Sequence, residues 1–170
     1  HVRPGRREMK PLDQLRGVER AIVMKAGRRA GSLLRGRDGV VFGYDRDYVD
    51  EGGRAVATTL PVSVRPVVTH APGALPPFFS GLLPEGRRLA ALRVAVKTSA
   101  DDEVTLLLAV GGDTVGDVQV IPDGQGPAEV EPRVSVGDWA EIRFLDLLAA
   151  SVGDPHAVDR VALPGAQDKV

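Results

Sequence analysis

Ala21-Ile22-Val23-Met24-Lys25-Ala26 is a β-prone run, and with the two runs that follow it forms the stretch that decides the fold. The turn residues 27–29 lead from it into residues 30–34, and a second turn over residues 36–39 leads into Val40-Val41-Phe42-Gly43-Tyr44. Three short runs separated by glycine-containing turns predict an antiparallel meander. A fourth strand is predicted over residues 58–64, where prolines restrict it to an edge or an irregular position.

Helical patterns follow the predicted meander. Residues 76–86 begin with prolines at positions where a helix accepts them, and they predict a short helix of about two turns. Leucine and valine at helical spacing predict a second helix over residues 87–96, packed behind the first. Ser99, with an acidic residue three positions on, is predicted to cap a third helix over residues 104–110, which Gly111 ends.

The remaining pattern holds one more strand and one more helix. Residues 117–121 alternate and predict a strand ending at Pro122, and the polar residues 123–133 predict a surface loop. A last helix is predicted over residues 139–150, with Trp139, Ile142 and Leu145 on one face. This order predicts an α+β fold, in which a small antiparallel sheet has helices packed on one face.

Composition narrows the functional classes. The 170 residues are 43% apolar, which suits one domain, and 22 basic against 23 acidic residues exclude a whole-surface basic field for nucleic acid. The chain has no cysteine, which excludes disulfides and thiol chemistry, and three dispersed histidines argue against a His-based metal site. No apolar run is long enough to cross a bilayer, so we expect no membrane contact and a cytoplasmic location.

Both ends of the sequence look cut, so we expect a piece of a longer protein. The charged residues 1–20 predict a flexible leader, with a short helix possible around residues 12–16.

Several clusters have a structural and a functional interpretation, and we favour the structural one. Residues 111–116 form a glycine-rich turn rather than a phosphate loop, because they follow a helix and precede a strand. The acidic run 101–103 suits a capped helix start better than a metal cluster. His70 and His156 suit solvated loops. Three arginines of the helical region suit a solvated helix face rather than a nucleic-acid stripe: Arg87, Arg88 and Arg93. Phe78 and Phe79 suit the core rather than a partner surface.

Residues 165–169 carry the most informative local chemistry. Small residues around a glycine let backbone amides approach an anion, and Lys169 could neutralise phosphate charge. The spacing is not that of a P-loop, and an ordinary turn before a strand would have the same composition. From the residues alone, both interpretations stay open.

Three motifs in this order resemble a known family, the HipA-type serine/threonine protein kinases, which are the toxins of HipBA toxin–antitoxin systems. They are PFFSGLLPEG at residues 77–86, GDTVGDVQVIP at residues 112–122 and LPGAQDK at residues 163–169. Together with the meander they extend the resemblance over residues 21–170. It implies an N-terminal subdomain over residues 21–150 and the start of a kinase core over residues 151–170.

The resemblance implies that one loop binds the phosphates of ATP through its backbone: Gly165, Ala166, Gln167, Asp168 and Lys169. Family members place the catalytic and Mg²⁺-binding residues farther along, so we assign no catalytic or metal residue here, and ATP and Mg²⁺ belong to the parent protein only. We expect this chain alone to be inert with ATP. Many relatives carry a regulatory serine three residues before the loop glycine, where this sequence has Ala162.

The implied partners are a helix-turn-helix antitoxin of the HipB type and a protein substrate, in known relatives an aminoacyl-tRNA synthetase. DNA is expected to be contacted only through the antitoxin. The alternative function is a stand-alone, non-enzymatic subdomain that binds or neutralises a partner kinase toxin. We favour the kinase fragment, because the predicted nucleotide loop has no purpose without a kinase body.

Overall fold

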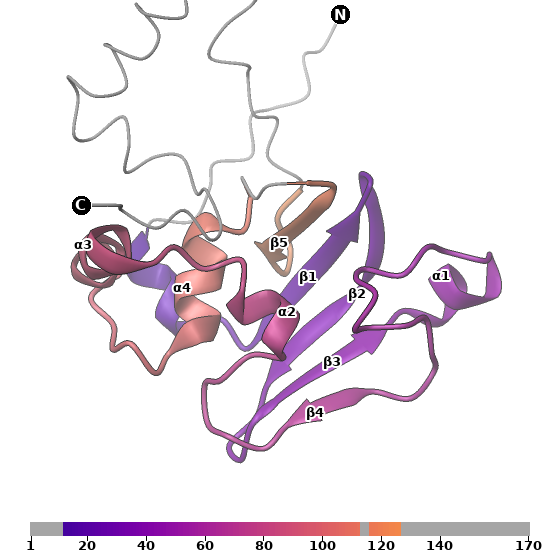
Figure 1. The fold of residues 1–170 in the computed structure, drawn as a ribbon, viewed down its shortest axis with the longest axis horizontal. Coiled ribbons are helices and arrows are strands. Elements are labelled where there is room, and N and C mark those ends of the chain that lie inside the picture. Colours follow the sequence, from indigo (N-terminus) through magenta and orange to yellow (C-terminus); the bar gives the residue numbers. More distant parts are fainter. Residues whose placement is uncertain (1–11, 113–115, 127–170) are drawn as a thin grey trace, which may run out of the picture. The chain divides into compact units, whose positions relative to one another are not determined.

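Five antiparallel strands form one sheet in the spatial order β4-β3-β2-β1-β5 (Figure 1). A computed structural model describes residues 12–112 and 116–126, all of which belong to one compact unit. The strands are β1 (Arg20–Lys25), β2 (Arg28–Arg35), β3 (Val40–Tyr44), β4 (Val67–Thr69) and β5 (Val118–Pro122). The helices are a 3-10 helix, η1 (Leu12–Gly17), and the α-helices α1 (Arg46–Asp50), α2 (Pro77–Ser80), α3 (Gly86–Val96) and α4 (Glu103–Val110).

The predicted meander is confirmed as β1, β2 and β3. A two-residue turn joins β1 to β2, and both of its residues have positive φ, 49° at Ala26 and 75° at Gly27. This combination matches the right-handed twist of the flanking strands. A change of register after Val23 leaves Ala30 as the extra residue of a bulge in β2. The predicted strand before Pro122 is β5, which returns to pair with β1.

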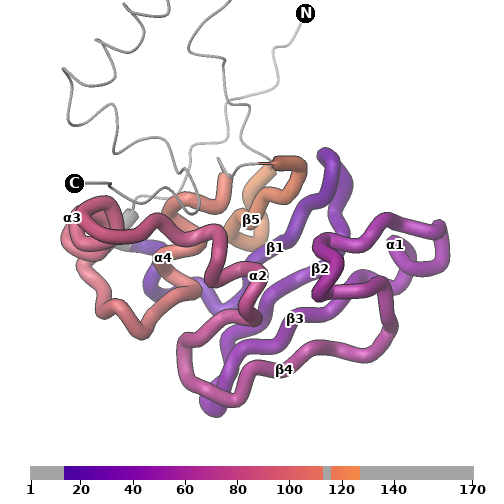
Figure 2. Tube along the Cα trace, viewed as in Figure 1, coloured from indigo at the N-terminus to yellow at the C-terminus, as the bar shows by residue number. Residues whose placement is uncertain are grey.

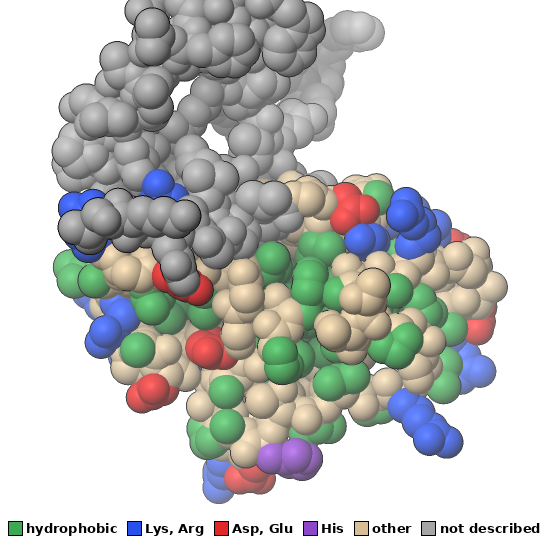
Figure 3. Space-filling view, in the orientation of Figure 1, with side chains coloured by type: hydrophobic (Ala, Val, Ile, Leu, Met, Phe, Trp, Pro, Cys, Tyr) green, Lys and Arg blue, Asp and Glu red, His purple; other side chains and the backbone are tan. Residues whose placement is uncertain are grey.

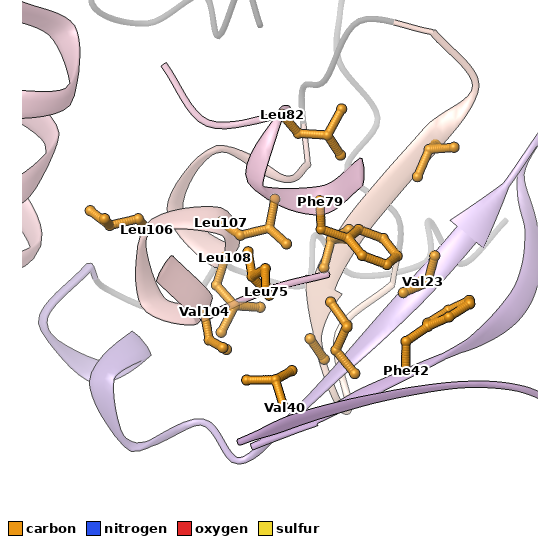
Figure 4. Close-up of a cluster of buried hydrophobic side chains, with 14 of the residues drawn as sticks. Val23, Val40, Phe42, Leu75, Phe79, Leu82, Val104, Leu106, Leu107 and Leu108 are labelled. Carbon is orange, nitrogen blue, oxygen red and sulfur yellow. The ribbon is translucent and has the colours of Figure 1, made fainter. Parts of the chain in front are cut away.

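Helices α2, α3 and α4 lie on one side of the sheet, as Figures 1 and 2 show. Between these two layers is the main core, in which Val23, Phe42, Phe79 and Leu107 are buried (Figure 4). The ring of Phe79 in α2 lies 5.2 Å from that of Phe42 in β3, so an aromatic contact joins the helical layer to the sheet. The predicted α+β arrangement, with helices packed on one face, is therefore confirmed.

The fourth predicted strand is wrong. Residues 58–64 form no strand, and only an isolated bridge joins Ala57 to Leu60. The Tyr44 hydroxyl instead accepts a hydrogen bond from the Val56 amide and donates one to the Leu60 carbonyl, which holds this segment as a loop. The strand at that edge of the sheet is β4, which pairs with β3 through Val67, Val68 and Thr69.

Two further expectations need correction. The helix predicted over residues 76–86 is a single turn, because α2 ends at Ser80 and the chain turns again before α3. The predicted leader is also too long: Leu15 and Val18 are buried in the main core, so the fold includes η1. Residues 1–11 and the predicted helix over residues 139–150 lie outside the described residues, as does most of the predicted loop over residues 123–133. Among described residues, no helix is long and apolar enough to span a membrane.

Candidate functional site

The predicted nucleotide loop, Gly165 to Lys169, lies outside the described residues, as does Ala162. Its role stays a prediction. The described residues do include the first of the three motifs and most of the second. The contacts of these two segments define the candidate site.

Side chains of the first motif are mostly internal. Phe79, Leu82 and Leu83 are buried in the main core, and Phe78 packs against its edge with its ring 5.2 Å from that of Phe79. The interpretation of the two aromatic side chains as core is confirmed. The motif contributes packing surface between sheet and helices.

Two adjacent carboxylates, Asp102 and Glu103, lie where α4 begins. Asp102 is the N-cap of α4, because its carboxylate accepts a hydrogen bond of 3.3 Å from the Thr105 amide. The prediction of Ser99 as the cap was wrong by one turn, whereas the interpretation of the acidic run as a capped helix start is confirmed. Among described residues, no group of acidic or histidine side chains could hold a metal ion.

Asp102 also binds two groups outside α4. The Thr98 hydroxyl donates to Oδ2 at 2.8 Å, and Nη1 of Arg35 in β2 lies 2.9 Å from Oδ1. Arg35 donates from Nη2 to the Thr105 hydroxyl as well, at 2.8 Å. Burial alone would raise the pKa of Asp102, but the hydrogen bonds from Thr105 and Thr98 and the charge of Arg35 outweigh burial and hold the pKa below its ordinary value.

Glu103 connects α4 to the first motif. Its Oε2 atom accepts hydrogen bonds from the Leu75 amide at 2.7 Å and from the Ser80 hydroxyl at 2.8 Å. Ser80 is the last residue of α2, so a single carboxylate oxygen fixes both ends of the segment that carries α2. Asp102 and Glu103 thus form a brace between β2, α2 and α4.

Asp117, in the second motif, is held by Lys25, the last residue of β1. The Lys25 ammonium donates to Asp117 Oδ1 at 2.7 Å and to the Val56 carbonyl at 3.4 Å, and the Ala26 amide donates to the Asp117 carbonyl at 2.6 Å. The hydrogen bond from Lys25 lowers the pKa of Asp117. These contacts fix the point at which the second motif enters β5.

The histidines and arginines considered above differ in their exposure to solvent. His70 is exposed, as predicted, and His1 and His156 lie outside the described residues. Arg93 is exposed too, but Arg88 departs from the predicted solvated face, because its Nε and Nη1 atoms are buried. Acidic and basic side chains are interspersed over the face drawn in Figure 3, which does not resemble the single-sign field of a nucleic-acid interface.

Arg35 and the pairing of Glu103 with Ser80 were not predicted. The residues of these contacts lie far apart in the chain, 70 positions for Arg35 and Thr105 and 23 for Ser80 and Glu103. The only sequence signal is an arginine at the end of a β-prone run. Among described residues, the motif segments therefore contribute packing and hydrogen-bonded braces.

Comparison with known proteins points to one family. The family model described as HipA N-terminal domain matches residues 21–121, which is more than half of the chain. A curated relative of Sinorhizobium fredii (strain NBRC 101917 / NGR234), named Putative kinase Y4mE, is 31% identical over 157 residues. That match covers 85% of this chain and 36% of the relative, so the chain spans about a third of that curated relative's length.

Two solved structures are similar. One is described as the N-terminal domain of HipA toxin: it is 25% identical, the match covers 61% of this chain and 92% of that chain, and the TM-score is 0.47. The other is a chain of the Shewanella oneidensis MR-1 complex of the toxin–antitoxin proteins HipA and HipB with operator DNA. It is 21% identical, the match covers 79% of this chain and 29% of that chain, and its TM-score of 0.52 supports a common fold.

Proposed function

Because this chain belongs to the HipA N-terminal domain family, we propose that it is the N-terminal part of a HipA-type serine/threonine protein kinase toxin. The observation that carries the proposal is the family match over residues 21–121. The curated relative's name, which describes a kinase, and its greater length support a longer parent protein. In this proposal the 170 residues do not transfer phosphate by themselves.

The described part of the chain acts in this proposal as a support for the nucleotide site of the parent. The brace of Asp102 and Glu103 fixes α2 and α4 against the sheet, and Lys25 fixes the second motif. A rigid support is what a phosphate-binding loop needs, because transfer depends on holding the nucleotide in position. Residues 165–169 would then contact ATP through backbone amides and Lys169.

Phosphate transfer tests this proposal. The gene is read past codon 170, the complete parent protein is expressed, and transfer from radiolabelled ATP with Mg²⁺ is measured on a protein extract. We expect transfer by the parent, a loss of at least about tenfold in the Lys169→Met variant, and none by the 170-residue chain. The matched control is Lys97→Met, at the exposed C-cap of α3, which should leave transfer unchanged.

Two outcomes would contradict the proposal. Transfer by the 170-residue chain alone would show that its own residues are sufficient. A reading frame that stops at codon 170 would leave no kinase body, and the alternative function, a separate subdomain that binds a kinase toxin, would replace this one.

The proposed partner of the parent is a small helix-turn-helix antitoxin of the HipB type. The similar Shewanella oneidensis chain belongs to a complex with HipB and operator DNA. We expect the parent to copurify with the product of an adjacent antitoxin gene, and to be retained on operator DNA only when that product is present. An aminoacyl-tRNA synthetase is the first substrate to try.

A further inference from the structure

Strand β4 forms one edge of the sheet, and its side away from β3 pairs with no strand of the described structure (Figure 1). An edge strand offers unpaired backbone amides and carbonyls, which are a template for another extended chain. Exposed apolar side chains gather at this edge. Three of the five large ones among the described residues lie in β4 or just before it: Val64, Val67 and Val68, with 68%, 39% and 44% of their surface exposed.

The two valines of β4 point to opposite faces of the sheet. Val67 pairs with Phe42, which faces the main core, whereas Val68 pairs with Val41 on the other face. On that other face Val41 also pairs with Leu34, so an apolar row crosses β2, β3 and β4 and ends at the edge. Leu34 is itself 43% exposed. The edge is therefore apolar and open to solvent on both faces.

An extended strand suits this edge better than a helix or a flat surface. A helix docked on one face of the sheet would cover Val67 or Val68, but not both. A sixth strand paired with β4 places its alternate side chains beside each of the two valines. It also supplies the backbone hydrogen bonds that the outer side of β4 lacks. An isolated exposed valine needs no explanation, but a contiguous apolar patch marks an interaction surface.

Arg65, two residues before β4, sets the charge that suits such a strand. Its side chain is exposed, and none of the ion pairs in the described structure includes it. A charge and a proline at an edge prevent unselective pairing, and Pro66 follows Arg65. Residues 64–71 contain no acidic residue, so the same segment of a second copy would offer Arg65 no carboxylate. Charge complementarity therefore favours a different chain that carries an acidic residue.

We propose that the edge of β4 is a docking surface for an extended segment of a partner protein, apolar at alternate positions and acidic where it passes Arg65. The segment pairs with β4 as a sixth strand. Its apolar side chains contact Val67 and Val68, and its carboxylate pairs with Arg65. This inference is carried by the exposure and charge of the edge and does not depend on the proposed function.

Selection from a displayed library of short random peptides on the complete 170-residue chain tests this proposal. We expect enrichment of sequences with apolar residues at alternate positions and an acidic residue near one end. The strongest of these peptides should bind at least about tenfold more weakly to Val68→Lys than to the native chain. The matched control is Val94→Lys, which adds the same charge at an exposed valine of α3 and should bind as the native chain does. Selection on Arg65→Glu should enrich peptides with a basic residue instead.

Amide hydrogen exchange on the native chain locates the bound peptide and holds even where Val68→Lys folds poorly. Exchange within residues 67–69 should slow when the selected peptide is added. Exchange in β5, the other edge of the sheet, should not change. Without peptide, residues 67–69 should exchange as fast in the complete parent protein as in the 170-residue chain.

Each of four results would overturn the proposal. The first is a library that yields no alternating apolar sequences. The second is a selected peptide that binds Val68→Lys as tightly as the native chain, or that protects β5 instead of β4. The third is a dimer in sedimentation that Val68→Lys dissociates, which would identify a second copy as the occupant. The fourth is slow exchange of residues 67–69 in the parent alone, which would mean that the parent's own chain covers the edge.

Discussion

Gly31 in β2 lies closer to the backbone of β3 than a side chain would permit. A Cβ atom at this position would be 2.2 Å from the Gly43 carbonyl oxygen, a backbone atom that cannot turn away. We expect Gly31→Ala to lower the free energy of unfolding by about 1–3 kcal/mol, since the strands must separate to admit the methyl group. Urea unfolding measures this change.

Gly43 provides the matched control for Gly31. It lies in the neighbouring strand, pairs with Ser32, and a Cβ atom there would meet nothing within 4 Å. Gly43→Ala should change the free energy of unfolding by less than about 1 kcal/mol. Equal losses in both variants would mean that the close approach at Gly31 does not determine strand spacing.

Asp102 should make stability depend on pH in the acid range. Its pKa is lowered in the folded chain, so the carboxylate stabilises the fold above its unfolded pKa, and this stabilisation is lost as the pH falls through the folded value. We expect the free energy of unfolding of the native chain to fall between pH 5 and about pH 2, and to fall less in Asp102→Asn. Urea unfolding across this range checks the sign.

Thr98→Val provides a graded control for Asp102. It removes one donor to the carboxylate and leaves Arg35 and the Thr105 amide in place. Its pH dependence should therefore lie between those of the native chain and Asp102→Asn. An Asp102→Asn chain that loses as much stability in acid as the native chain would remove Asp102 as a cause.

At the scale of elements, α2 is one turn long and owes its place to what it buries. Phe79 is fully buried against Phe42, whereas Phe78, next to it, is only partly buried. We expect Phe79→Ala to lower the free energy of unfolding by about 3–5 kcal/mol and Phe78→Ala by less than half as much. Thermal or urea unfolding checks both, and equal losses would contradict the core assignment.

The elements that could be predicted are those with local signals. The runs β1, β2 and β3 are separated by glycine-containing turns, and α4 ends at Gly111, so pattern and structure agree. Residues 58–64 also have strand propensity, yet the Tyr44 hydroxyl binds the Leu60 carbonyl and the preceding Val56 amide instead. Strand β4 is three residues long and exists only through its pairing with β3, a contact that local sequence does not encode.

The same distinction applies to the site. A capped helix start at the acidic run could be predicted, because capping is local. Its partner Arg35 could not, since it reaches α4 from β2 across 70 positions of chain. The burial of Arg88 was likewise hidden, because its spacing in the helix matches that of an exposed arginine equally well.

At the scale of the whole molecule, the fold begins before the region that the family model matches. That match starts at residue 21, but Leu15 and Val18 already lie in the main core. The Arg35 amide, moreover, donates a hydrogen bond of 2.8 Å to the Glu19 carbonyl. Helix η1 also contacts α3 and α4.

A pair of shortened chains tests where the fold begins. A chain that starts at residue 12 keeps η1, and a chain that starts at residue 21 lacks Leu15 and Val18. Losing two buried side chains should lower the free energy of unfolding by about 3–6 kcal/mol, on the scale of large-to-small core substitutions. The chain from residue 12 should match the complete one to within about 1 kcal/mol in urea unfolding.

Leu15→Ala in the complete chain is the control, with an expected loss of about 2–4 kcal/mol in the free energy of unfolding. If the chain from residue 21 is as stable as the chain from residue 12, η1 is not part of the folded unit.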